Sequence, residues 1–460
     1  MGAMPTGARQ RHAEQARAQI DFAHVDEHVL RDRETVQVAL VAAQGRFRLA
    51  AAVAEVPRFA GEARAGGSAN LGQGCERAWE FLGLAHGAVL YASRRSESWY
   101  TAAIPRGRGH DMSGNGTSAR GVRQVGYFDC AGGGQVVVDG RVAFVAHMKA
   151  PHGTTIVDVS DPSRPRQLAS IEVPPGTHSH KVRAGNGLML VNREAHGGQG
   201  SSPNAPRGLG IYDVSNPSRP REITLWRSGG TGVHRFTFDG RYAYISPEMD
   251  GYVGNIVMIL DLADPSRPQE VGRWWMPGQW TAGGETPTWS GRQHRCHHPI
   301  REGNRLYVSY WHGGFVILDI EDMAKPRFVS GLDWSPPFLT PTHTALPVPF
   351  PLHGRKVMLV ADEDVAKLAQ GPPSFLWLVD ISDEKKPGAV RELPGGHATD
   401  SPSRSSRAAI SRARRSPSTE IPVAWFAHGL RIVDIANPHA PREVGALPAA
   451  GAGGLVARLQ

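Results

Sequence analysis

Histidines crowd one short stretch of the chain. Residues 291–300 read GRQHRCHHPI, which places His294, His297 and His298 beside Cys296. Imidazole and thiolate groups bind transition metals, and imidazole also serves as a general acid or base. The stretch alone suits a metal site, a catalytic base or a polar loop, so its role depends on what else in the chain is directed to the same place.

A phrase that recurs six times organises most of the chain. Each copy has a β-branched and aliphatic run, an aspartate, and a polar, mostly proline-containing turn. The run predicts a buried strand, the Asp and Pro residues predict a turn, and a hairpin signal such as Asp239-Gly240 precedes each copy. The copies are TIVDVSDPSRPRQL (155–168), GIYDVSNPSRPREI (210–223), MILDLADPSRPQEV (258–271), VILDIEDMAKPRFV (316–329), WLVDISDEKKPGAV (377–390) and RIVDIANPHAPREV (431–444).

The spacing of these copies predicts the fold class. About four strands in roughly 50 residues, with no intervening helical period, are typical of the blades of a β-propeller. The phrases resemble the LVIVD repeat over residues 121–445, which implies a propeller of seven blades. Residues 307–326, YVSYWHGGFVILDIEDMAKP, are also similar to one blade of the selenium-binding protein family, which includes methanethiol oxidases. We therefore expect an all-β propeller with six recognisable four-stranded blades and a seventh that is degenerate or built from both termini.

Three segments do not carry the repeat. Residues 1–120 are expected to form an irregular or poorly ordered N-terminal extension, with a helix as the alternative for residues 31–56. Residues 401–418 are Ser/Arg-rich and are interpreted as a solvated insertion, an anion-binding loop or a reading-frame artefact. Residues 446–460 are expected to be a C-terminal tail.

Four histidines share one position of the repeat. His180, His234 and His298 each lie eight residues before an apolar residue of the next strand, and His343 fits the same place if its hairpin is longer. The first strand of each propeller blade lines the central channel, so equivalent side chains converge around the axis. Imidazoles arranged in this way suit Fe, Cu, Mn or Zn. We therefore predict His180, His234, His298 and His343 as metal ligands.

Neighbouring residues suggest further roles. His178 and His294 share a strand face with His180 and His298 and are candidate catalytic residues. Cys296 shares that face as well, whereas His297 is expected to face away. Three carboxylates at the ends of second strands could orient the imidazoles; they are Glu194, Glu248 and Asp362.

These residues predict a metal-dependent enzyme, an oxidoreductase or a hydrolase, that acts on a small organic substrate. Two alternatives stay open. The chain could be a binding or scaffold propeller whose histidines only fill the channel, or a metal-free hydrolase or lyase that uses a channel histidine as a general base.

Composition excludes several other classes. The net charge is +8, but no nucleotide-binding or nucleic-acid-binding motif is present. Three cysteines without a CxxC pair argue against a disulfide framework. No apolar run is long enough to span a bilayer and no signal peptide is seen, so a cytoplasmic location is expected, with periplasmic or secreted locations left open. The sequence leaves the substrate, the metal and the oligomeric state undetermined.

Overall fold

The computed structural model shows an all-β chain. Within the residues it describes, the regular elements are strands and one short 3-10 helix, η2 (Thr281–Gly283). None of these residues lies in a helix with the length and apolar character that a membrane span requires. The described residues are 34–43, 46–54, 87–94, 120–130, 132–195, 205–289, 292–335, 337–338, 340–363, 374–394, 409–410, 418–424 and 430–447.

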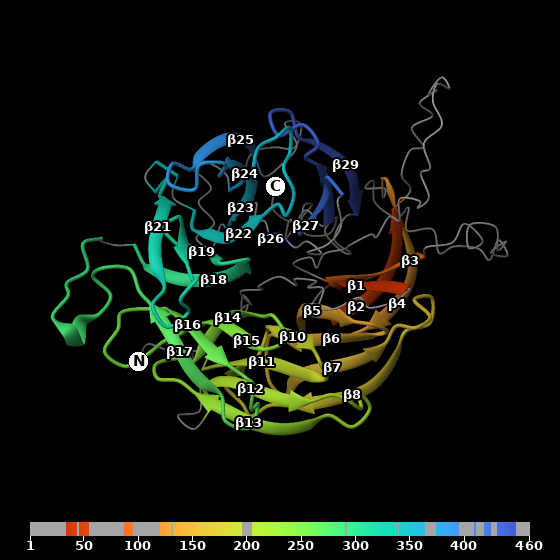
Figure 1. Cartoon of the computed structure of the whole chain (residues 1–460). Helices are drawn as coiled ribbons and strands as arrows, with labels where there is room; N and C mark the ends of the chain where they lie inside the picture. Colours follow the sequence, from red (N-terminus) through yellow and green to blue (C-terminus); the bar gives the residue numbers. More distant parts are fainter. Residues whose placement is uncertain are drawn as a thin grey trace, which may run out of the picture.

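The described strands form seven blades around one axis, and within each repeat the strands run from the axis outward (Figure 1). The first two repeat blades contain β5 (Gly133–Asp139), β6 (Val142–His147), β7 (His152–Asp158) and β8 (Arg166–Glu172), then β9 (Thr177–His178), β10 (Val182–Gly185), β11 (Leu188–Ala195), β12 (Gly208–Asp213) and β13 (Arg221–Arg227). The next two contain β14 (Val233–Phe238), β15 (Tyr242–Pro247), β16 (Val257–Asp261) and β17 (Gln269–Trp274), then β18 (His294–Glu302), β19 (Arg305–Trp311), β20 (Phe315–Asp319) and β21 (Arg327–Leu332). The last two contain β22 (Thr342–Pro347), β23 (Val357–Asp362), β24 (Phe375–Asp380) and β25 (Gly388–Pro394), then β26 (Ala409–Ile410), β27 (Glu420–Ala424), β28 (Leu430–Asp434) and β29 (Arg442–Leu447).

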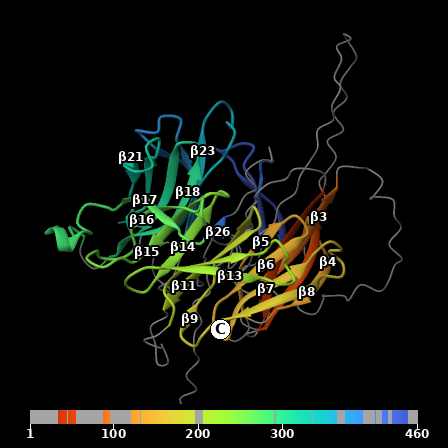
Figure 2. The ribbon, with the colours of Figure 1, turned by 60° about the horizontal axis from the view of Figure 1, so that its bottom comes forward.

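The seventh blade comes from the N-terminal part of the chain. It contains β1 (Glu34–Ala43), β2 (Arg46–Ala54), β3 (Gly87–Arg94) and β4 (Val122–Asp129) in the order β1-β3-β2-β4. It lies between the β5–β8 blade and the β26–β29 blade (Figure 1, Figure 2). Arg120, just before β4, exchanges two backbone hydrogen bonds with Ala446 of β29. Segments near the two ends of the chain therefore close the ring together.

The recurring aspartate fixes the turn between the third and fourth strand of each blade. Asp158 accepts the backbone N–H of Ser160 at 3.0 Å and a hydrogen bond from Arg166, eight residues away, at 3.0 Å. The same contact to the residue two positions on recurs at the other copies, as the sequence predicted from the turn chemistry of Asp; they are Asp213, Asp261, Asp319, Asp380 and Asp434.

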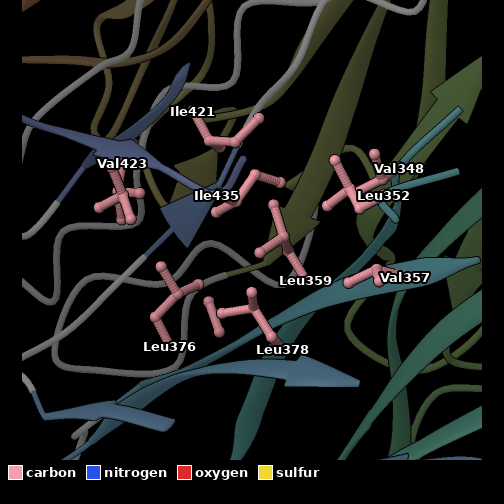
Figure 3. Close-up of a cluster of buried hydrophobic side chains, with 11 residues drawn as sticks. Val348, Leu352, Val357, Leu359, Leu376, Leu378, Ile421, Val423 and Ile435 are labelled. Atoms are coloured by element: carbon pink, nitrogen blue, oxygen red, sulfur yellow. The ribbon is translucent and has the colours of Figure 1, made fainter. Parts of the chain in front are cut away.

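Apolar side chains fill the spaces between neighbouring blades. Figure 3 shows one such cluster, in which residues of the β22–β25 blade meet residues of the β26–β29 blade. Leu359 and Leu378 from the first blade and Ile421 from the second are completely buried there. Further clusters join the other consecutive repeat blades in the same way. The blades are thus held by apolar burial, and the polar residues of the axis lie inside this frame.

The expectations for the N-terminal region and for the start of the C-terminal tail need correction. The N-terminal region is not irregular throughout, and residues 31–56 do not form a helix, because β1 and β2 pair there as an antiparallel hairpin. Within residues 401–418, the described residues are 409–410, which form the short innermost strand β26, and residue 418; the interpretations of this segment otherwise fall on residues 401–408 and 411–417, which lie outside the described residues. Residues 446–447 belong to β29, whereas the tail after them is not described.

The aspartate turn predicts a graded stability effect at Asp158. Replacing it with Ala removes the acceptor for Ser160 and should lower the free energy of unfolding by about 1 kcal/mol at pH 7. Asp158→Asn keeps an oxygen for Ser160 and loses only the ion pair with exposed Arg166, which should cost less than about 0.5 kcal/mol. Equal losses for Ala and Asn in chemical denaturation would contradict this account.

The same turn predicts a pH dependence. Burial acts to raise the pKa of Asp158, but hydrogen bonds from Ser160 and Arg166 outweigh it and the pKa lies below its ordinary value of 3.8. The folded state therefore favours the carboxylate, and the stabilisation is present above pH 3.8 and lost as the pH falls through the lowered pKa. The difference between the wild type and Asp158→Ala should shrink accordingly in denaturation curves at low pH.

Candidate metal centre

The innermost strands carry β-bulges near the axis. The pairing between first and second strand shifts register in β5, β14, β18 and β22. A bulge adds a residue to one strand and re-aims its side chain. His234, His297 and His343 lie inside the shifts of β14, β18 and β22, and His180 lies in the matching gap between β9 and β10.

The hydrogen-bonded pairing of the strands defines which residues of different blades are equivalent. The second strand of each blade begins opposite the repeat aspartate, at Leu188, Tyr242, Arg305 and Val357. Three residues further along, these strands pair with Val182, Phe236, Pro299 and Ala345 of the innermost strands. Two residues before each of those stands a histidine; the four are His180, His234, His297 and His343.

The predicted ring was therefore wrong by one residue in β18. The sequence comparison equated Leu306 with the start of the other second strands, whereas β19 begins at Arg305. A slip of one residue exchanges the two faces of a strand. His297, which was expected to face away, takes the ring position, and His298 lies one residue beyond it.

The ring residues form a continuous arc of imidazoles, which His178 extends. The ring centroids of His178 and His180 lie 3.8 Å apart, and those of His180 and His234 lie 5.3 Å apart. His297 follows at 4.9 Å from His234, and His343 at 4.8 Å from His297. In the first repeat blade the equivalent residue is Gly134, where an added Cβ would come within 2.9 Å of the His180 carbonyl oxygen. The arc therefore begins at His178 and His180 because backbone occupies the preceding place.

Backbone carbonyls and a carboxylate orient the rings. Nδ1 of His178 donates to the Met148 carbonyl at 2.7 Å, and Nδ1 of His297 donates to the His343 carbonyl at 2.7 Å. Each of these rings thereby directs the lone pair of Nε2 away from the backbone. Within the described part of the chain, buried Nε2 of His297 has no hydrogen-bond partner. Nδ1 of His234 lies 3.0 Å from both carboxylate oxygens of Glu194.

Two sets of possible metal donors lie in this arc. His178, His180 and Glu194 form one set and His297, His343 and Glu363 form the other. In each set the donor atoms lie within 4.8 Å of one another. Two imidazoles and one carboxylate are a donor combination that divalent transition metals accept.

Burial controls the charge state of the arc. Burial, reinforced by the charges of Arg235 and other nearby groups, holds the pKa of His297 and of His298 well below the ordinary value of 6.5. Both rings are therefore neutral near pH 7, which is the form that binds metals. Burial acts to raise the pKa of Glu194, but the neighbouring His234, His178 and Arg295 outweigh it and the pKa is lowered. Glu194 is thus a carboxylate.

Five segments of the propeller match a family model described as the LVIVD repeat. The matched residues are 133–172, 205–225, 237–275, 302–333 and 423–447. The chain carries LVIVD repeats in these five segments. This confirms the family resemblance seen in the sequence, and the seven blades described above confirm the propeller fold. The similarity of residues 307–326 to the selenium-binding family stays a prediction.

Other comparisons add similarity of shape alone. The LVIVD-repeat protein resembles Sqt1 of Saccharomyces cerevisiae with 7% sequence identity and a TM-score of 0.44, over 67% of this chain and 72% of that one. The N-terminal domain of Nup159 is similar with 11% identity and a TM-score of 0.39, over 70% and 77% of the two chains. A prolyl endopeptidase structure shows 13% identity and a TM-score of 0.44, over 90% of this chain and 50% of that one. No curated protein was found to match the chain.

Two other predicted residues of the LVIVD-repeat protein lie elsewhere. The His294 ring stacks on Trp289 at 4.7 Å, and its Nδ1 lies 3.2 Å from the Met276 sulfur, so it does not extend the arc. Cys296 packs in an apolar cluster with Tyr244 and other buried residues. Burial holds the pKa of its thiol well above the ordinary value, so the free thiol of Cys296 is protonated near pH 7.

The expected carboxylates were placed correctly in one of three cases. Glu194 reaches the arc, but Glu248 instead accepts the backbone N–H of Thr231 at 2.8 Å. Asp362 accepts hydrogen bonds from Trp377 Nε1 at 2.7 Å and the Phe375 backbone at 3.3 Å. Besides Glu194, a second carboxylate reaches the arc, that of Glu363, which was not among the expected residues. The repeat contains a signal for Glu363. Glu194, Glu248 and Glu363 each lie six residues after the first residue of a second strand.

The structural role of Asp362 predicts a pH effect on stability. Burial raises the pKa of this carboxyl from 3.8 to about 8, although hydrogen bonds from Trp377 and Phe375 act to lower it. The contribution of the protonated carboxyl to the free energy of unfolding is complete below pH 3.8 and is lost as the pH rises through about 8. Asp362→Asn, which cannot ionise, should therefore stabilise the protein at pH 8 by a few kcal/mol, at about 1.4 kcal/mol per pKa unit. Denaturation curves at pH 5 and pH 8 check this, and a variant as pH-dependent as the wild type would contradict it.

Proposed function

We propose that the LVIVD-repeat protein is a metal-dependent enzyme whose axial histidines and glutamates hold a transition metal. The observation that supports this most strongly is positional. One repeat position carries histidine in four consecutive blades, and three of those histidines, His180, His297 and His343, fall with His178 into two compact sets that Glu194 and Glu363 complete. Packing alone gives no reason for a carboxylate to complete both sets.

The donor chemistry narrows the metal. Nitrogen and carboxylate donors without a thiolate suit Fe(II), Mn(II) and Zn(II). The partnerless Nε2 of His297 is the type of atom that a metal would satisfy, since a buried polar atom without a partner is costly. Two protein imidazoles and one carboxylate would leave positions for substrate, and the metal would supply Lewis-acid or redox chemistry there. The reaction class is oxidation, or metal-assisted hydrolysis or elimination, of a small organic molecule.

The chain's own residues would orient the donors and handle protons. The carbonyls of Met148 and His343 fix the rings of His178 and His297. His234 belongs to neither donor set, and its side chain is 11% exposed beside Glu194, which is 15% exposed. An imidazole held by a carboxylate at a solvent-accessible edge can take up or release a proton.

Metal analysis of two neighbouring variants tests the proposal. The purified full chain should retain about one equivalent of a transition metal or more. His297→Ala removes a donor and should lose most of the metal of its set, whereas His298→Ala, a matched buried neighbour, should retain it. Elemental analysis of both proteins, with thermal melting as a folding control, measures this. Less than about a tenth of an equivalent in the wild type, or equal loss in both variants, would overturn the proposal.

The pair of Glu194 and His234 favours a second candidate, a metal-free hydrolase or lyase with His234 as the general base. For this candidate, a screen of small organic substrates should find an activity that chelators leave intact. His234→Ala should reduce it by about 100-fold or more, while His294→Ala, a partly buried histidine outside the arc, should retain it. Loss of activity on chelation would reject the metal-free mechanism in favour of the first proposal.

A further inference from the structure

A second layer of side chains follows the imidazole arc along the axis. Lys181 comes directly after His180, and Arg235 comes directly after His234, so the two cations occupy equivalent positions in adjacent blades. Lys181 and Arg235 are each 1% exposed, and Arg183, two residues beyond Lys181, is 2% exposed. Three cationic side chains are therefore buried close to the axis.

These cations converge on the same region as the arc. Nη2 of Arg235 lies 2.5 Å from Nε2 of His343, although the two residues are 108 positions apart in the sequence. Arg235, Arg183 and Lys181 are also the cations whose charges, after burial itself, depress the pKa of His298. His298 holds the same repeat position as Lys181 and Arg235, so the layer is continuous across three blades.

The position of these cations differs from that of the other repeat-borne cations. Arg166 and Arg327 lie at the outer turns, with side chains 73% and 69% exposed, and pair with aspartates of their own blades. A cation at the surface is solvated, but a buried one loses its hydration and attracts negative charge strongly through the low-dielectric interior. Three cations gathered at the axis therefore make the local potential more positive, which favours holding an anion there.

We propose that the axial channel binds a small oxyanion, such as a carboxylate, phosphate or sulfonate, on Lys181, Arg183 and Arg235 beside the imidazole arc. Guanidinium groups present paired N–H donors that match two oxygens of such groups, and an ammonium adds a point charge. The anion site rests on these cations alone. Its further consequence, that the substrate of the proposed metal centre is anionic, rests on the proposed function.

Binding to metal-free protein tests the anion site separately from the metal centre. The full chain, dialysed against a chelator that is then removed, is titrated at constant ionic strength with oxalate, inorganic phosphate and sulfate, and with oxamide as the uncharged analogue of oxalate. At least one anion should bind and raise the melting temperature, whereas oxamide should not. The order of affinity among the three anions identifies which oxyanion the site prefers. Failure of every anion, or equal binding of oxamide, would overturn the proposal.

Substitutions identify the residues. Lys181→Met and Arg183→Met should each weaken anion binding by about tenfold, while the exposed control Arg327→Met should leave it unchanged. Thermal melting without anion checks that each variant is folded. Unchanged affinity in both folded axial variants would overturn the assignment. Because the protein carries no metal in these titrations, a failed metal analysis and a failed anion titration lead to separate conclusions.

Discussion

The register of the innermost strands is the constraint on which the site depends. Each repeat aspartate faces the first residue of a second strand, and that pairing determines which residue of the innermost strand borders the axis. A shift of one residue in β18 would replace His297 with His298 in the arc. A shift of one residue in β23 would move Glu363 out of the arc. The Asp turn and the two-residue hairpin of Gly303 and Asn304 therefore decide the chemistry of residues that lie far from them.

The sequence predicted what local chemistry determines and missed what depends on pairing. The Asp turns, the strand pattern of the repeats and three of the four ring histidines followed from side-chain type and spacing. The fourth was missed because an apolar Leu306 was the more obvious anchor than Arg305, whose aliphatic stem can occupy a strand start as well. A seventh blade was expected, but its strands within residues 1–120 were missed for a different reason. Its strand order β1-β3-β2-β4 includes a parallel pair that no repeat phrase encodes.

The polar contacts of the axis run between blades. His178 donates to Met148 of the preceding blade, His297 donates to a carbonyl of the following blade, and Glu194 meets a histidine of the next blade. None of these contacts can form within one isolated repeat. The donor sets therefore require a closed ring, and the apolar clusters between blades supply the burial that offsets the cost of gathering polar groups at the centre.

The bulges explain how two functional layers arise from consecutive residues. In a regular strand, adjacent side chains point to opposite faces, and in a propeller both faces are covered by neighbouring blades. His234 and Arg235 nevertheless both reach histidines of blades further around the ring, His297 for the first and His343 for the second. Both lie within the register shift of β14, where the ladder is interrupted. The extra residue thus directs two successive side chains to the axis, His234 toward the imidazole arc and Arg235 toward the buried cations beside it. A strand without a bulge would point these two side chains to opposite faces.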